Sequence, residues 1–151
     1  MCSSDLEKAG RAIGLPIVIL MTLAGAALAA EKNLTFQGVA IQGYDPVAYF
    51  TDANPVPGNP DVTATHDGAI YQFASTDHKA VFEADPGKYV PQYGGYCAYG
   101  ASQGYNAAIE PEQFTVTDGK LYLNYNADVR KRWDQDRAGY ISKADAYWAA
   151  Q

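Results

Sequence analysis

The sequence predicts an α+β fold: a small antiparallel sheet of two hairpins, packed with short helices in a single domain. Two Asp-Gly pairs, Asp67-Gly68 and Asp118-Gly119, each lie between runs of alternating apolar residues. This pattern is the strongest short-range signal of a β-hairpin. Helix-capping residues follow the hairpins, and 151 residues suit one domain of ordinary size. No repeat of solenoid length is evident.

The N-terminal stretch predicts a secretory signal peptide over residues 1–29. Lys8 and Arg11 precede an uncharged, largely apolar stretch from position 12 to 30, in which Ala27 and Ala29 form an Ala-x-Ala site. Cleavage there would leave a periplasmic or secreted protein with no membrane span. The alternative is an uncleaved anchor, because 19 residues nearly span a bilayer. An extended lead-in (30–42) and the domain itself (43–150) follow.

The first half of the domain carries clear turn and capping signals. Asp45-Pro46 is typical of a turn, and the apolar run behind it suits a short buried strand. Ser75 is a helix N-cap, and Asp85-Pro86 starts another helix with proline at its first position. The expected elements are a turn at 43–46, a strand at 47–50, hairpin strands at 62–65 and 69–73, and helices beginning after Ser75 and Asp85.

The second half begins with a segment rich in glycine and tyrosine, at 89–104. The second hairpin is expected at 114–124, and a helix at 128–137 should turn Val129 and Trp133 inward. Ser142 and Asp145 resemble a capping box that opens a last helix. The basic run Arg130-Lys131-Arg132 is typical of a solvated helix face.

Composition limits the possible chemistry. The formal net charge of -6 argues against a nucleic-acid partner, because binding to the phosphate backbone needs a basic face. The chain has 12 tyrosines but only two cysteines, two histidines and two methionines. Removal of residues 1–29 would take both methionines and Cys2, and would leave Cys97 as the one thiol.

Transition-metal binding is the first candidate activity. A thiolate from Cys97 with imidazoles from His78 and His66 would suit copper or zinc. The alternative is structural, with His78 bonded locally near a helix N-terminus and His66 in a hairpin turn. Cys97 could instead be a redox thiol if its pKa were lowered, or a small buried hydrophobe.

Tyrosines provide a further candidate site. Five of them lie within positions 89–105, and aromatic rings with polar tips suit a small-molecule cleft or a protein interface. We expect Tyr93, Tyr96 and Tyr99, together with Tyr44, to contact such a ligand. The alternative is that these tyrosines fill the outer core with their hydroxyl groups in water.

Spaced landmarks in the chain resemble the YHS-domain family. The similarity begins at Gly43-Tyr44-Asp45-Pro46-Val47-Ala48-Tyr49-Phe50. It continues through Tyr71-Gln72-Phe73-Ala74-Ser75, His78, Phe82, Asp85-Pro86 and Lys88-Tyr89, so the family core spans about 44–90. The remaining landmarks, which resemble a secreted bacterial subgroup of YHS proteins, are Pro91-Gln92-Tyr93-Gly94-Gly95-Tyr96-Cys97-Ala98, Asp118-Gly119-Lys120-Leu121-Tyr122-Leu123, Ala144-Asp145 and Trp148.

The resemblance implies a metal-binding module. Related modules carry cysteine ligands just after Asp-Pro-Val and between Phe and Ser, where this chain has Ala48 and Ala74. His78 stands where a third ligand would fall. The expected function is therefore an exported, non-enzymatic binding module for copper or zinc through His78, Cys97 and His66. The alternatives are a redox protein centred on Cys97 and a small-ligand or protein-binding module built on 89–105.

Overall fold

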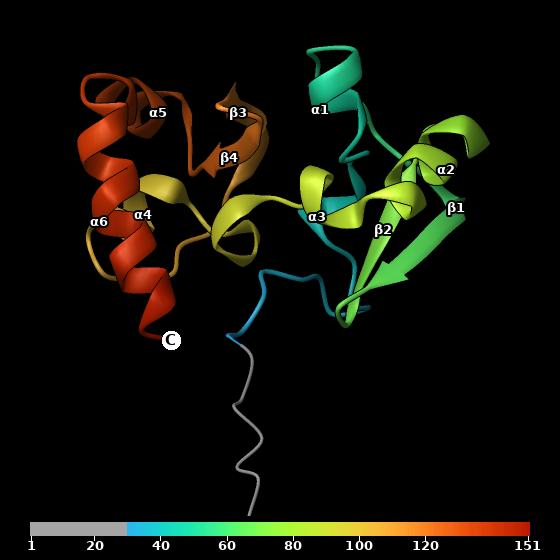
Figure 1. Ribbon diagram of the computed structural model, residues 1–151, viewed down its shortest axis with the longest axis horizontal. Coiled ribbons are helices and arrows are strands. Elements are labelled where there is room, and N and C mark those ends of the chain that lie inside the picture. Colours follow the sequence, from blue (N-terminus) through green and yellow to red (C-terminus); the bar gives the residue numbers. More distant parts are fainter. Residues whose placement is uncertain (1–29) are drawn as a thin grey trace, which may run out of the picture.

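The structure is a computed structural model that describes residues 30–151. Its elements form two groups along the chain (Figure 1). The first group contains η1 (Ile41–Gly43), α1 (Ala48–Thr51), β1 (Asn59–His66), β2 (Ala69–Phe73), α2 (Thr76–Ala84) and α3 (Pro86–Tyr89). The second contains η2 (Gln92–Gly95), α4 (Ala98–Ser102), β3 (Glu110–Thr117), β4 (Lys120–Asn124), α5 (Ala127–Asp134) and α6 (Arg137–Ala149). The α+β class is confirmed.

Both predicted hairpins form at their Asp-Gly turns. Asp67 and Asp118 have φ of 48° and 51°, and a glycine with positive φ follows each, as a type I′ turn requires. The hairpins make two separate two-stranded sheets rather than one. An isolated parallel bridge joins each second strand to a preceding segment of chain, Val39 to Ile70 and Pro91 to Leu121.

The two groups repeat the same order of elements at a nearly constant spacing. Asp118 lies 51 residues after Asp67, and strands β3 and β4 have the same lengths as β1 and β2. The strand register shifts between Asn59 and Thr63 in the first hairpin and at the equivalent place in the second. The chain therefore contains an internal repeat, which the sequence analysis missed.

Details inside the repeats agree as well. Ser75 caps α2 by accepting the amide of the third residue beyond it, and Asn126 caps α5 in the same way. Phe82 and Trp133 are fully buried at the same place in these helices. Each packs on the tyrosine of its own hairpin, at ring-centroid distances of 4.9 Å for Tyr71 and 5.4 Å for Tyr122.

The first elements of the two repeats, η1 and η2, also have similar backbone conformations. Both η1 and η2 contain a run of positive φ, with values of 52°, 51° and 85° from Ile41 to Gly43 and 57°, 61° and 83° from Tyr93 to Gly95. Gly95 lies 52 residues after Gly43, one more than the spacing between the hairpins. The loop that joins the short helix to the first strand is therefore one residue shorter in the second repeat.

Three sequence expectations are corrected. Residues 47–50 are not a strand, because Asp45 Oδ1 accepts hydrogen bonds from the amides of Val47 and Ala48 and so stabilises the turn that leads into the helix α1. The last helix begins at Arg137 and not near Ser142, because Asp136 caps it through the Gly139 amide. The lead-in at 30–42 is only partly extended, since Leu34 and Ala40 bridge across a tight turn and η1 begins at Ile41.

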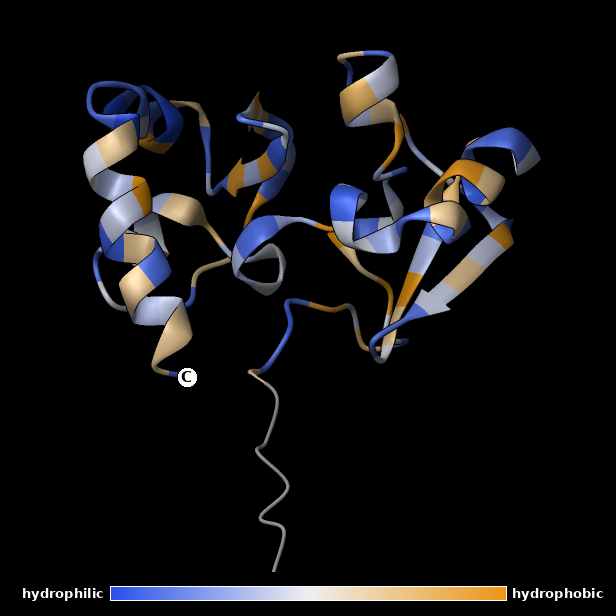
Figure 2. Cartoon of the chain, viewed as in Figure 1, coloured by the Kyte–Doolittle hydropathy of each residue, from blue (hydrophilic) through white to orange (hydrophobic). Residues whose placement is uncertain are grey.

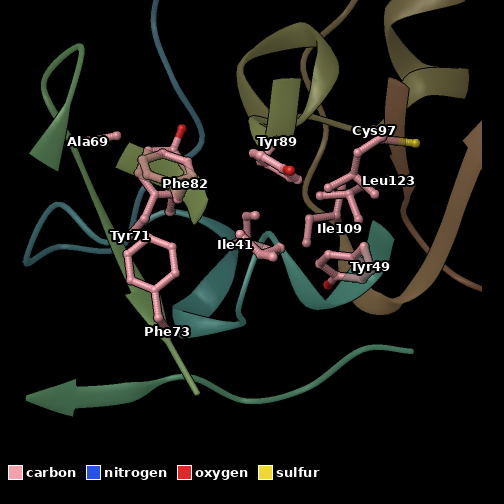
Figure 3. Packing of buried hydrophobic residues seen from close by; sticks show 13 residues of the cluster. Ile41, Tyr49, Ala69, Tyr71, Phe73, Phe82, Tyr89, Cys97, Ile109 and Leu123 are labelled. Carbon is pink, nitrogen blue, oxygen red and sulfur yellow. The ribbon is translucent and has the colours of Figure 1, made fainter. Parts of the chain in front are cut away.

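The main core contains residues from both repeats. Figure 3 shows Ile41 and Tyr49 of the first repeat beside Ile109 and Leu123 of the second. A smaller cluster lies between α4, β4 and the helices α5 and α6, around the fully buried Trp133. In Figure 2, α5 is largely hydrophilic, whereas α2 mixes hydrophilic and hydrophobic residues. Because the main core is shared, the repeats form one domain.

The predicted signal peptide lies outside the described residues. Within 30–151, no helix is both long enough and apolar enough to cross a membrane.

Candidate functional site

In the first repeat, both oxygens of the buried Asp45 carboxylate accept hydrogen bonds from the protein itself. Asp45 is 0% exposed. Its Oδ1 accepts the amides of Val47 at 2.8 Å and Ala48 at 3.3 Å. Its Oδ2 accepts hydrogen bonds from the Ala74 amide at 2.9 Å and from Nδ1 of His78 at 2.6 Å. The carboxylate therefore joins the turn before α1 to the start of α2.

In the second repeat, other residues occupy the equivalent positions. Cys97 replaces Asp45, and Val129 replaces His78. The Gly100 amide donates to the Cys97 sulfur at 3.4 Å, as the backbone of α1 does to the Asp45 carboxylate. Because position 129 is a valine, the second repeat has no counterpart of the Asp45–His78 hydrogen bond.

The surroundings of the two sites correspond in two further contacts. The Asp45 amide donates to the Val56 carbonyl at 2.8 Å, and the Cys97 amide donates to the Ala107 carbonyl at 3.0 Å. The amide of Tyr125 faces the Cys97 sulfur, just as the amide of Ala74, its counterpart 51 residues earlier, faces Asp45. The equivalence is therefore one of local geometry as well as of spacing.

A cleft of about 270 Å³ opens at this position in the second repeat. Cys97, Ala107, Tyr125 and Val129 line it, and all four are counterparts of residues around the Asp45–His78 bond. The remaining lining residues are Tyr99, Tyr105 and Arg132. We call this cavity the tyrosine cleft. Its walls are three aromatic rings and two aliphatic side chains, and the Arg132 guanidinium lies 5.8 Å from the centre of the Tyr99 ring.

The chemistry of Cys97 is that of a buried thiol. The side chain is 1% exposed, and its S–H donates to Oδ1 of Asn124 at 3.5 Å. Backbone amides of Gly100, Tyr125 and Tyr99 face the sulfur and favour the thiolate, but burial has the larger effect and raises the pKa of Cys97. A raised pKa and burial both lower thiol reactivity.

We expect Cys97 to react slowly with alkylating reagents in the folded protein. The folded protein should be modified at least about a hundredfold more slowly than the protein in denaturant, because reaction requires the thiolate to reach solvent. Mass spectrometry after timed exposure to iodoacetamide measures both rates. Equal rates in the two conditions would contradict the structure and favour a redox thiol.

The predicted metal ligands lie in three different surroundings. His78 is bonded to Asp45, and Cys97 lines the tyrosine cleft. His66 lines a second cavity of about 210 Å³, together with Lys32 and Trp148, and its ring lies edge-on to Phe82. Within residues 30–151, no group of three or more His, Cys, Asp or Glu side chains is placed to hold a metal ion.

The four predicted tyrosines also separate. Tyr99 lines the tyrosine cleft. Tyr93 is buried, and its hydroxyl donates to Asp145 at 2.9 Å; burial first, and this carboxylate second, raise its pKa. Tyr96 packs near Trp148, at a centroid distance of 6.4 Å. The Tyr44 hydroxyl donates to Glu112 at 2.8 Å, which raises the pKa of Tyr44. Of the four, Tyr99 alone faces this cleft.

Sequence reasoning missed five residues of the tyrosine cleft. Tyr105 was counted in the tyrosine-rich segment but not named as a contact, and Val129 and Arg132 were assigned to helix faces. Ala107 and Tyr125 were given no role. The 51-residue spacing is the signal that could have found them, since it places Tyr125 and Val129 opposite Ala74 and His78.

No protein-family model matches the chain, and neither a curated protein nor a solved structure is similar to it.

Proposed function

We propose that the protein is an exported, non-enzymatic binding module that holds a small molecule in the tyrosine cleft. One observation carries this proposal: the cleft opens where the first repeat is closed by the Asp45–His78 bond. In the first repeat, the Asp45–His78 bond at this position stabilises the fold. In the second repeat, the same position is open and is surrounded by tyrosines. The landmarks resemble the YHS family, which implies a metal-binding module, and so the resemblance agrees with the non-enzymatic binding role but does not name this ligand.

The lining supports a ligand with a ring. Small-molecule sites are largely apolar and aromatic, with a few polar groups that orient the ligand. Tyr105 and Tyr125 are about half exposed and so present free ring surface at the cleft. The volume of about 270 Å³ is roughly nine times the ~30 Å³ share of one liquid water molecule, which is room for one substituted ring.

Benzyl alcohol, a neutral single-ring probe, tests the proposal. We expect it to bind with a Kd on the order of 1 mM, which is typical of a ligand of few atoms. In ¹⁵N–¹H NMR spectra, the shifted amides should be those around Tyr99, Tyr125 and Val129. The variant Val129→Phe fills the cleft and should abolish these shifts.

The matched control is Val81→Phe, at an exposed position of α2 in the first repeat. It adds the same volume on the equivalent helix but away from the cleft, so binding should be unchanged. Denaturant melts of both variants show that each is folded. Absence of localised shifts with the wild-type protein at tens of millimolar probe would refute the proposal.

Transition-metal binding is a second proposal, favoured by the surroundings of His78. A carboxylate holds its Nδ1, the ring is 20% exposed, and metal-ligating histidines commonly have such a carboxylate behind them. Other ligands would have to come from a partner or from solvent. Elemental analysis for copper and zinc, with His78→Gln as the comparison, decides it. The redox proposal is weaker, because burial and the raised pKa of Cys97 both oppose it.

A further inference from the structure

Arg132 is a cation at the tyrosine cleft that forms no ion pair with any residue in 30–151. The basic residues near it in the sequence are engaged differently. Arg130 and Arg137 both pair with Asp134, at 4.0 Å and 2.8 Å. Lys131 lies one residue away but lines a different surface hollow. The basic run is therefore not one uniform solvated face, because a single member of it is positioned at the cleft.

The Arg132 guanidinium lies over an aromatic ring. The distance to the centre of the Tyr99 ring is 5.8 Å, within the range of a cation–π contact. Such a contact orients the planar group but leaves its N–H donors free. Guanidinium is also the side-chain group whose geometry best matches a carboxylate.

The negative charge of the rest of the protein limits where an anion can bind. The chain carries a net charge of -6, so its general field repels anions. An anion would bind at this cleft only through a local cation, and Arg132 is the one cationic residue among those that line it. A neutral ligand would form no ion pair with the guanidinium.

We infer that the ligand of the tyrosine cleft is a small planar carboxylate, with its ring among Tyr99, Tyr105 and Tyr125 and its carboxylate on Arg132. This inference rests on the proposed function and adds the chemical class of the ligand. Arg132 is then the residue that determines specificity, while the tyrosines and Val129 provide the shape.

Benzoate and benzyl alcohol form the test pair, because they share the ring and differ in charge. In NMR titrations of the wild-type protein, we expect benzoate to bind about fivefold more tightly than benzyl alcohol. Arg132→Gln should remove that difference by weakening benzoate binding. Lys131→Gln is the matched control, and it should retain the preference because its side chain is not at the cleft.

Salt provides an independent readout. Raising the NaCl concentration should weaken benzoate binding and leave benzyl alcohol binding unchanged, because screening acts on the ion pair alone. Equal affinity for the two probes, or an unchanged preference in Arg132→Gln, would overturn the inference while the cleft stands as a neutral-ligand site. Failure of both probes to bind would overturn the proposed function as well.

Discussion

Replacing Asp45 by alanine is expected to destabilise the protein by about 3–5 kcal/mol, because it removes a buried carboxylate that accepts several hydrogen bonds. The variant leaves the buried amides of Val47 and Ala48, the amide of Ala74 and the His78 ring without their acceptor. Each unsatisfied buried donor costs on the order of 1–3 kcal/mol, and local relaxation recovers part of that sum. Urea denaturation followed by tryptophan fluorescence measures the change in the free energy of unfolding.

The second repeat supplies the matched control for Asp45→Ala. Cys97→Ala changes the equivalent position, but the thiol is a weak hydrogen-bonding group that acts mainly as a small hydrophobe. We therefore expect a cost of about 1 kcal/mol, the value of one buried methylene-sized group. Similar costs for Asp45→Ala and Cys97→Ala would show that the carboxylate does not hold the first repeat together.

Trp133→Ala is expected to cost about 3–5 kcal/mol, as for other large aromatic side chains removed from a core. Trp133 is fully buried and packs on Tyr122 in the smaller core cluster. Its Nε1 has no hydrogen-bond partner within the described part of the chain. Trp133→Phe should therefore cost much less than the alanine variant, because it removes that unpartnered group and keeps a ring. Phenylalanine already occupies the equivalent place, as Phe82.

Phe82→Ala is the companion variant, with an expected cost in the same range of about 3–5 kcal/mol. Circular dichroism and fluorescence should report one coincident unfolding transition for each variant, because the main core contains residues of both repeats. Two separate transitions in either variant would contradict this shared core. A cost below about 1 kcal/mol for Trp133→Ala would contradict its burial.

Local signals predicted most of the elements correctly. The Asp-Gly turns located both hairpins because type I′ turns demand positive φ, which few residues adopt easily. Ser75 located the start of α2 because an N-cap side chain acts on an amide three residues away. Two of the three corrected assignments, the strand at 47–50 and the late start of the last helix, have the same cause. Asp45 accepts the amides that lead into α1 and Asp136 caps α6, and apolar patterning alone does not show which of several polar residues starts a helix.

The candidate site was only partly predictable. The tyrosine-rich segment was recognised from its composition, and Cys97 was singled out because it is the one cysteine after residue 29. Its neighbours in the cleft, Tyr125 and Arg132, come from β4–α5 and lie more than twenty residues away. Their approach depends on how the second hairpin packs against α4, which no local pattern encodes.

By itself, the sequence determined the α+β class, the two hairpins, the acidic character and the scarcity of thiols and imidazoles, because turn chemistry and composition act within a few residues. Only the tertiary structure decided what the scarce residues do. His78 is bonded to Asp45 in one repeat, whereas Cys97 and Val129 at the same positions border a cleft in the other. The physical reason is that a buried carboxylate needs several donors at once, and folding brings those donors together from the start of α1 and the start of α2.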